Sequence, residues 1–153
     1  MNKKSHNLIT SFLLLSFIFL LFFVLVKKEN ISSKANYIRI AGQNIKVDLA
    51  LDEKTRIQGL SGRSNLGEDE GMLFIFDSPG KYSFWMKDMN FSIDMVWLNK
   101  DQKIIYIKEN ASPESFPNSF GPNEEALYVL ELVAGFTREH GVAIGDQIMF
   151  DIR

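Results

Sequence analysis

The sequence predicts a mainly β domain of the α+β class: a compact, largely antiparallel curved sheet or barrel behind an N-terminal transmembrane helix. From Asn36 onward, short apolar segments of strand length recur, separated by Gly, Pro, Asn and Asp. Three of the connections between these segments are short enough for hairpins, which join antiparallel strands. A closed or strongly curved sheet would also protect its edges from pairing with other chains. The N-terminal helix is predicted from an apolar run near the start of the chain.

This apolar run comprises 19 uncharged residues, Leu8 to Val26, and follows Lys3 and Lys4. As a helix it would be roughly 28 Å long, close to the thickness of a bilayer core. We therefore predict a cytoplasmic segment at 1–7, a single-pass anchor in the cell membrane at 8–26, a linker at 27–35 and an extracytoplasmic domain at 36–153. The alternative is a signal peptide and a secreted domain, with Ser33-Lys34-Ala35 as the candidate cleavage site.

Within 36–153 the pattern predicts about seven or eight short strands and two short helices. Residues 37–40 and 45–49 alternate apolar and polar side chains around Gly42, which indicates a hairpin. Asp52 is a candidate N-cap of a helix of about two turns, and Ile57 and Leu60 are expected to face inward from it. The remaining strands are expected near 72–76, 82–87, 93–98, 103–107, 127–133 and 147–152, with the second helix at 136–140.

Composition excludes several classes of function. The chain has no cysteine, which rules out disulfides, thiolate metal sites, iron–sulfur clusters and a cysteine nucleophile. Its 17 basic and 19 acidic residues are balanced, so no clustered charge predicts nucleic-acid binding. Met86, Met89 and Met95 could ligate Cu(I), but flexible core packing is the favoured interpretation. There is no G-x-S-x-G motif, and His140 is the only histidine after residue 6 that could act as a base. We predict neither a metal nor a cofactor.

Three segments together identify a family resemblance. "RIQGLSGR", "DEGMLFIFDSPGKYSFWMKDMNFSIDMVWLN" and "YVLELVAGF…GVAIGDQI" resemble the prokaryotic domain of unknown function 192, DUF192, from about residue 47 to residue 148. The resemblance implies a compact, mainly β fold, often behind an export signal, and no named substrate. Family members often have Asn-Thr where this chain has Asp88-Met89, and a proline before Leu-Asp where this chain has Ser92-Ile93 before Asp94. Many also have cysteines in the proline-rich loop, so a function of those thiols cannot apply here.

Two carboxylates interrupt otherwise apolar strands. By strand alternation, Asp94 shares a face with Val96 and Leu98, and Glu131 lies within the run "YVLELVAG". Both side chains are therefore expected to point into the fold or to lie at its mouth, where a buried charge needs partners. A satisfied internal polar network would explain them, and so would the floor of a pocket.

Other candidates surround these carboxylates. Trp85 and Lys87 share one side of a strand end, where an aromatic face beside polar groups is typical of small-ligand pockets. The predicted ligand-binding residues are Arg56, Trp85, Lys87, Asp94 and Glu131.

The leading hypothesis is a membrane-tethered exported module that binds a small molecule or an envelope component at these residues. The first alternative is a hydrolase that uses Asp94 and Glu131. The second is a protein-interaction module that uses the loop at 110–125, which is long for a structureless connection and could also act as a lid.

Overall fold

A computed structural model describes residues 36–150. The predicted cytoplasmic segment, anchor and linker lie outside the described residues, and so do residues 151–153. In the part that is described, no helix has both the length and the apolar character needed to cross a membrane.

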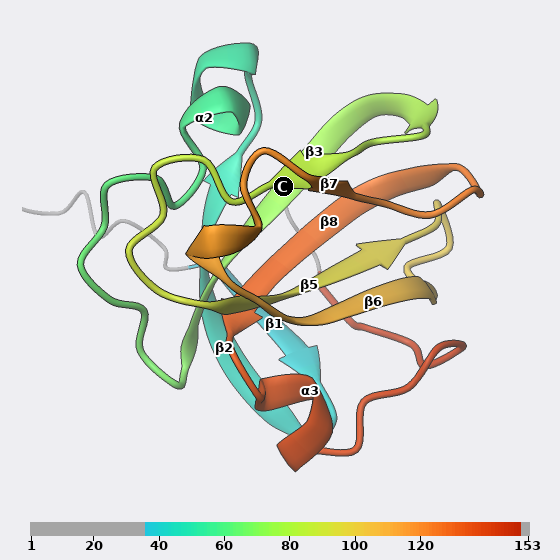
Figure 1. Cartoon of the computed structure of the whole chain (residues 1–153). Coiled ribbons are helices and arrows are strands. Elements are labelled where there is room, and N and C mark those ends of the chain that lie inside the picture. Colours follow the sequence, from blue (N-terminus) through green and yellow to red (C-terminus); the bar gives the residue numbers. More distant parts are fainter. Residues whose placement is uncertain (1–35, 151–153) are drawn as a thin grey trace, which may run out of the picture. The chain divides into compact units, whose positions relative to one another are not determined.

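The domain is mainly β, with a six-stranded sheet in the order β1-β2-β3-β8-β5-β6 and a two-stranded sheet of β4 and β7 (Figure 1). The strands of the large sheet are β1 (Asn36–Ile40), β2 (Gln43–Ala50), β3 (Glu70–Gly80), β5 (Ile93–Leu98), β6 (Ile104–Ala111) and β8 (Ala126–Val133). The small sheet pairs β4 (Phe84–Trp85) with β7 (Ser119–Phe120). Two short helices, α2 (Glu53–Gln58) and α3 (Phe136–Glu139), lie on opposite sides of the domain, and a 3-10 turn, η1, covers Pro113–Ser115.

The sheet is mixed, because β2 and β3 run parallel while the other neighbours are antiparallel. Parallel strands need a crossover connection, and residues 51–69, which contain α2, supply it. The predicted hairpin of β1 and β2 is confirmed. The predicted barrel is wrong, because the six-stranded sheet is not closed. In the described part of the predicted last strand, residues 147–150, the chain makes isolated bridges from Gln147 to Lys103 and from Met149 to Arg39.

Helix α2 begins as predicted at Asp52, whose side chain accepts a hydrogen bond from the Thr55 backbone N–H at 2.8 Å. The Asp52 N–H in turn donates to the Thr55 hydroxyl at 3.2 Å, which completes a capping box. The prediction that Ile57 faces inward is wrong, since its side chain is 73% exposed. The helix ends at Gly59, whose φ of 50° favours glycine, and the chain then turns Leu60 into the core.

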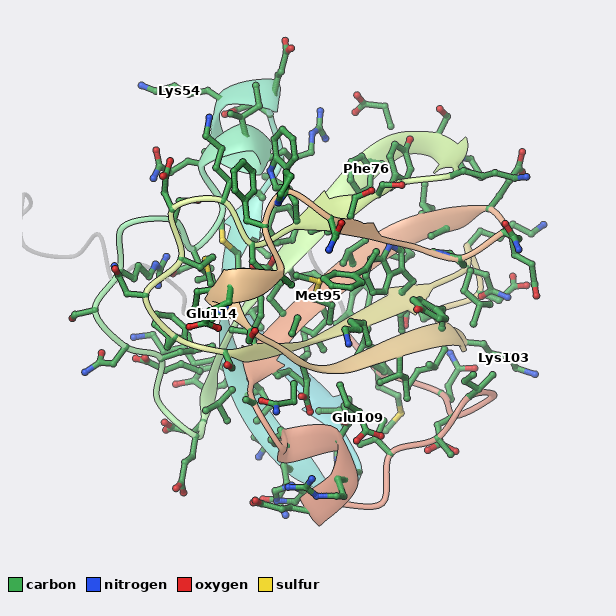
Figure 2. The ribbon with its side chains drawn as sticks, in the orientation of Figure 1. Lys54, Phe76, Met95, Lys103, Glu109 and Glu114 are labelled. Carbon is green, nitrogen blue, oxygen red and sulfur yellow. The ribbon has the colours of Figure 1, made fainter. Side chains whose placement is uncertain are left out.

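Alternation along the strands divides the core between the two faces of the sheet. One face carries an aliphatic cluster that includes Leu73, Val96 and Leu130 and packs under α3 and the C-terminal segment. The other face carries a sulfur- and aromatic-rich cluster that includes Met95 and Trp97. Met95 is fully buried and lies in the interior of the domain, whereas Lys54 of α2 points outward (Figure 2). Both faces of the middle of the sheet are therefore covered by packed side chains, so a carboxylate on either face is buried.

Candidate functional site

The two carboxylates lie on neighbouring strands but on opposite faces of the large sheet. In the β5–β8 pairing, Asp94 lies opposite Leu132 and Met95 lies opposite Glu131. Since paired residues share a face and successive residues alternate, Asp94 belongs to the aliphatic face and Glu131 to the aromatic face. The sheet itself separates them. They cannot form the acid–base pair that the hydrolase hypothesis requires.

Asp94 is fully buried, and its carboxylate accepts four hydrogen bonds. Oδ1 accepts from the backbone N–H groups of Asn110 at 2.8 Å and Gly135 at 3.1 Å. Oδ2 accepts from the backbone N–H of Thr137 at 2.9 Å and from its hydroxyl at 2.6 Å. Asn110 and Gly135 both have positive φ, at 46° and 92°, so the chain bends at both points where Oδ1 accepts. From strand β5, Asp94 thus caps helix α3 and joins this helix to the end of β6, which is a structural role.

Glu131 is also buried, at 5% exposure, but its Oε2 has no hydrogen-bond partner among residues 36–150. Burial in this apolar setting raises the pKa of the Glu131 carboxyl to about 8, against a smaller lowering by the Arg63 guanidinium. The reason is that an ionised carboxylate loses its hydration on burial and gains no pairing cation in return. At neutral pH Glu131 is therefore mostly a neutral acid, able to donate one hydrogen bond and to accept others.

Glu131 lines a cavity of about 90 Å³, which we call the Glu131 cavity. This volume is well above the ~10–15 Å³ that one water needs on the same measure. Trp85 and Ile57 form part of the lining and are 54% and 73% exposed, so the cavity reaches the surface. The complete lining is Arg56, Ile57, Gln58, Gly59, Leu60, Ser61, Phe74, Ser83, Phe84, Trp85, Met89 and Glu131.

The cavity forms where the crossover connection meets β4. Ser61 donates its hydroxyl to the Lys87 carbonyl at 2.8 Å, and the Gly62 N–H donates to the Asp88 carbonyl at 2.9 Å, so the segment after α2 is fastened to the segment after β4. Phe84 packs edge-on against Phe74 at 4.7 Å and against Trp97 at 5.8 Å between ring centroids, which fixes one aromatic wall. Arg56 is held beside the mouth because it donates to the Ile75 carbonyl at 2.6 Å.

Of the five predicted site residues, the structure brings Arg56, Trp85 and Glu131 together in the lining of this cavity. Lys87 lies just beyond β4 with an exposed side chain and is not a lining residue, although its backbone carbonyl accepts the Ser61 hydrogen bond. Asp94 is on the other face of the sheet and does not reach the cavity.

Sequence reasoning missed Phe74, Phe84 and Ser61 as lining residues. The aromatic residues look like ordinary core positions, and the serine lies in a connection with no motif of its own.

The proline-rich segment is more ordered than the predicted structureless loop. It contains η1 and β7, and β7 pairs with β4 through Phe84 opposite Phe120 and Trp85 opposite Ser119. Phe116 lies edge-on to Trp85, with 5.8 Å between ring centroids. The segment therefore supports the outer wall of the Glu131 cavity, although none of the residues that line the cavity belongs to it.

The remaining sequence candidates are the methionines and His140. Met86 and Met95 are buried core residues and Met89 is partly buried against the same cluster, which is consistent with a packing role. His140 follows α3, stacks on Phe136 and has its Nδ1 3.0 Å from the Phe136 carbonyl oxygen. Within residues 36–150, no three His, Asp or Glu side chains gather as they would around a metal ion.

Comparison with known proteins identifies the family. The family model DUF192, described as "Uncharacterized ACR", matches residues 36–150. The chain belongs to the DUF192 family.

Two solved structures are similar to this DUF192 domain. One, of a proposed transcription regulator from Sinorhizobium meliloti 1021, is 36% identical, with a TM-score of 0.69 over 76% of this chain and 91% of that one. The other, of a protein of unknown function from Novosphingobium aromaticivorans DSM 12444, is 26% identical, with a TM-score of 0.69 over 76% of this chain and 83% of that one. None of the curated proteins matches the chain. The comparisons establish the family and the fold and assign no activity to them.

Proposed function

We propose that this DUF192 protein is a membrane-tethered, extracytoplasmic module that binds a small molecule in the Glu131 cavity. One observation supports this above the others: Glu131, whose buried Oε2 has no hydrogen-bond partner among residues 36–150, lines an aromatic-walled cavity that reaches the surface. A buried carboxyl needs hydrogen-bond partners, and in a cavity large enough for water a ligand group that displaces water can supply them. Pockets with apolar walls and a few convergent polar groups are the usual form of small-ligand sites.

The predicted alternatives are less well supported. Hydrolysis by Asp94 and Glu131 would need both carboxyls at one substrate, and the sheet lies between them. An interaction module at 110–125 would use the exposed Phe116, but this residue packs against Trp85 at the cavity wall and so also serves the binding proposal. Transcription regulation, as proposed for the Sinorhizobium protein, would need a basic face that the balanced charge of this chain does not predict.

A thermal-shift screen of a small-molecule library against the full-length chain tests the binding proposal. A ligand at a hundred times its Kd should stabilise the fold by about 2.7 kcal/mol, which is an easily measured rise in melting temperature. The rise should be lost in Trp85→Ala, which removes one wall of the cavity. It should persist in the matched control Tyr37→Ala, which removes an aromatic side chain of similar exposure, 58%, from β1. Stabilising compounds that act equally on both variants would contradict the proposal.

The proposed membrane tether is tested separately. A reporter that is active only outside the cytoplasm, fused after Arg153, should be active and should sediment with membranes. An inactive fusion would reverse the proposed topology, and an active soluble fusion would favour the cleaved signal peptide instead.

A further inference from the structure

We infer that the ligand of the Glu131 cavity is an uncharged molecule with a flat apolar ring and an oxygen acceptor that takes a hydrogen bond from the Glu131 carboxyl. This inference rests on the proposed binding function and specifies the chemistry of the ligand. The groups around Glu131, their existing hydrogen bonds and ion pairs, and the aromatic cavity walls support it.

The two arginines that bear on the charge of Glu131, Arg56 and Arg63, both bind other groups. Arg56 donates to the Ile75 carbonyl and also lies 3.6 Å from the Asp77 carboxylate. Arg63 donates to Asp48 Oδ2 at 2.7 Å. Neither guanidinium forms an ion pair with Glu131, and the attraction of Arg63 only partly offsets the cost of burying an ionised carboxylate there. The favoured form of the empty site is the neutral acid, in agreement with the raised pKa of this group.

The other elements around Glu131 bring no further charge into the cavity. Across the sheet, Met72 of β3 and Met95 of β5 lie opposite Glu131, and both are uncharged. Strand β4 contributes Phe84 and Trp85 to the lining, and the segment after it contributes Met89. Arg56 is therefore the only other ionisable residue among those that line the cavity.

A neutral carboxylic acid has one hydrogen to donate, so its natural partner is a carbonyl, amide or ether oxygen. A cationic amine would have to ionise Glu131 and would also meet the Arg56 guanidinium at the mouth. A carboxylate ligand would bring a second acidic group beside Glu131, where each disfavours ionisation of the other. The aromatic walls and the volume of about 90 Å³ suit one ring of a small molecule.

Three probes of nearly the same shape separate these cases: benzamide, benzylamine and benzoate carry one phenyl ring and a neutral, cationic or anionic group. Their saturable binding to the full-length chain can be measured by ligand-observed NMR between pH 6 and pH 9.5. We expect benzamide to bind at least about tenfold more tightly than the other two at pH 6. Above pH 8 its Kd should rise by about tenfold per pH unit as Glu131 ionises. In Glu131→Gln, which keeps a donor but cannot ionise, the Kd should not change with pH.

The outcomes distinguish a wrong ligand class from a wrong site. Preferred binding of benzylamine that strengthens with pH, or preferred binding of benzoate, would overturn the inference and leave the cavity as a binding site. A pH-independent Kd for benzamide in the wild type would also overturn it, and this result does not depend on any variant that fails to fold. Absence of saturable binding by all three probes, or binding unaffected by Trp85→Ala but lost in Tyr37→Ala, would overturn the binding site itself.

Discussion

Asp94 and Glu131 occupy neighbouring strands of one sheet, and both are buried, yet their hydrogen bonding differs. Asp94 accepts four hydrogen bonds from Asn110, Gly135 and Thr137. Glu131 has an oxygen with no partner among residues 36–150 and lines a cavity instead. Burial alone thus does not mark a functional carboxylate. The hydrogen bonds of each oxygen distinguish the group that holds the fold together from the group that we propose binds a ligand.

The largest expected effect is that of Asp94→Ala. The change leaves three backbone N–H groups and one hydroxyl without their acceptor, and each such group costs about 1–3 kcal/mol when buried. We expect a loss of about 5 kcal/mol in the free energy of unfolding, measured by chemical denaturation, enough to unfold a marginal domain.

Asp77→Ala is the matched control for this change, because it removes a carboxylate that is 92% exposed. It should alter the free energy of unfolding by no more than about 0.5 kcal/mol. If Asp94→Ala were equally mild, the structural role assigned to Asp94 would be wrong.

Glu131 should have the opposite signature, in the pH dependence of stability. Its pKa is raised in the folded domain to about 8, so the folded state holds this proton more tightly than the unfolded chain does. The stabilising contribution is complete below the unfolded pKa of about 4.5, and it is lost as pH rises toward 8. Between these values the free energy of unfolding should fall by up to about 1.4 kcal/mol per pH unit relative to Glu131→Gln.

The measurement is a set of denaturation curves for wild type and Glu131→Gln at several pH values from 5 to 9. The difference between the two proteins isolates this group from all other titrations. A difference that is constant with pH would mean that Glu131 is ionised in the folded state, and the comparison with Asp94 would lose its basis.

Thr137→Val tests one of the four hydrogen bonds to Asp94 and should destabilise the domain less than Asp94→Ala does. It removes the hydroxyl that donates to Asp94 Oδ2 at 2.6 Å and keeps the backbone N–H that donates to the same oxygen. A hydrogen bond to a charged, buried acceptor contributes about 2 kcal/mol. Thr137→Ser keeps the hydroxyl and should be the more stable of the two variants in the same denaturation assay. The reverse order would show that the methyl group matters more than the hydrogen bond.

The smallest effect is expected for Asp52→Ala. Asp52 caps α2 as Asp94 caps α3, but it does so from the adjacent position in the chain and from an exposed site. Water can replace much of what the side chain provides, so the melting temperature should fall less than in Thr137→Val. A larger fall than that would show that α2, and with it the mouth of the Glu131 cavity, depends on its cap more than burial suggests.

Much of the fold was predictable because it depends on local patterns. The alternating hairpin of β1 and β2, the Asp52 cap and the apolar run at β3 and β5 are set by residues close together in the sequence. The inward direction of Asp94 follows from the same alternation. The parallel pairing of β2 and β3 was not predicted, although the helical segment between them is the signal for a crossover. A curved sheet or a barrel was expected, and the sheet is not closed into a barrel.

The sequence by itself determined a mainly β DUF192 domain and two inward-pointing carboxylates, since side-chain direction along a strand follows from the strand's period of two. Only the tertiary structure decided that Asp94 is surrounded by hydrogen-bond donors and that Glu131 lies beside a cavity. The donors to Asp94 come from segments 16 to 43 residues away, and the cavity beside Glu131 is formed by α2, β3 and β4 together. Whether a buried oxygen finds a donor depends on which distant segments pack against it, and no local pattern encodes that.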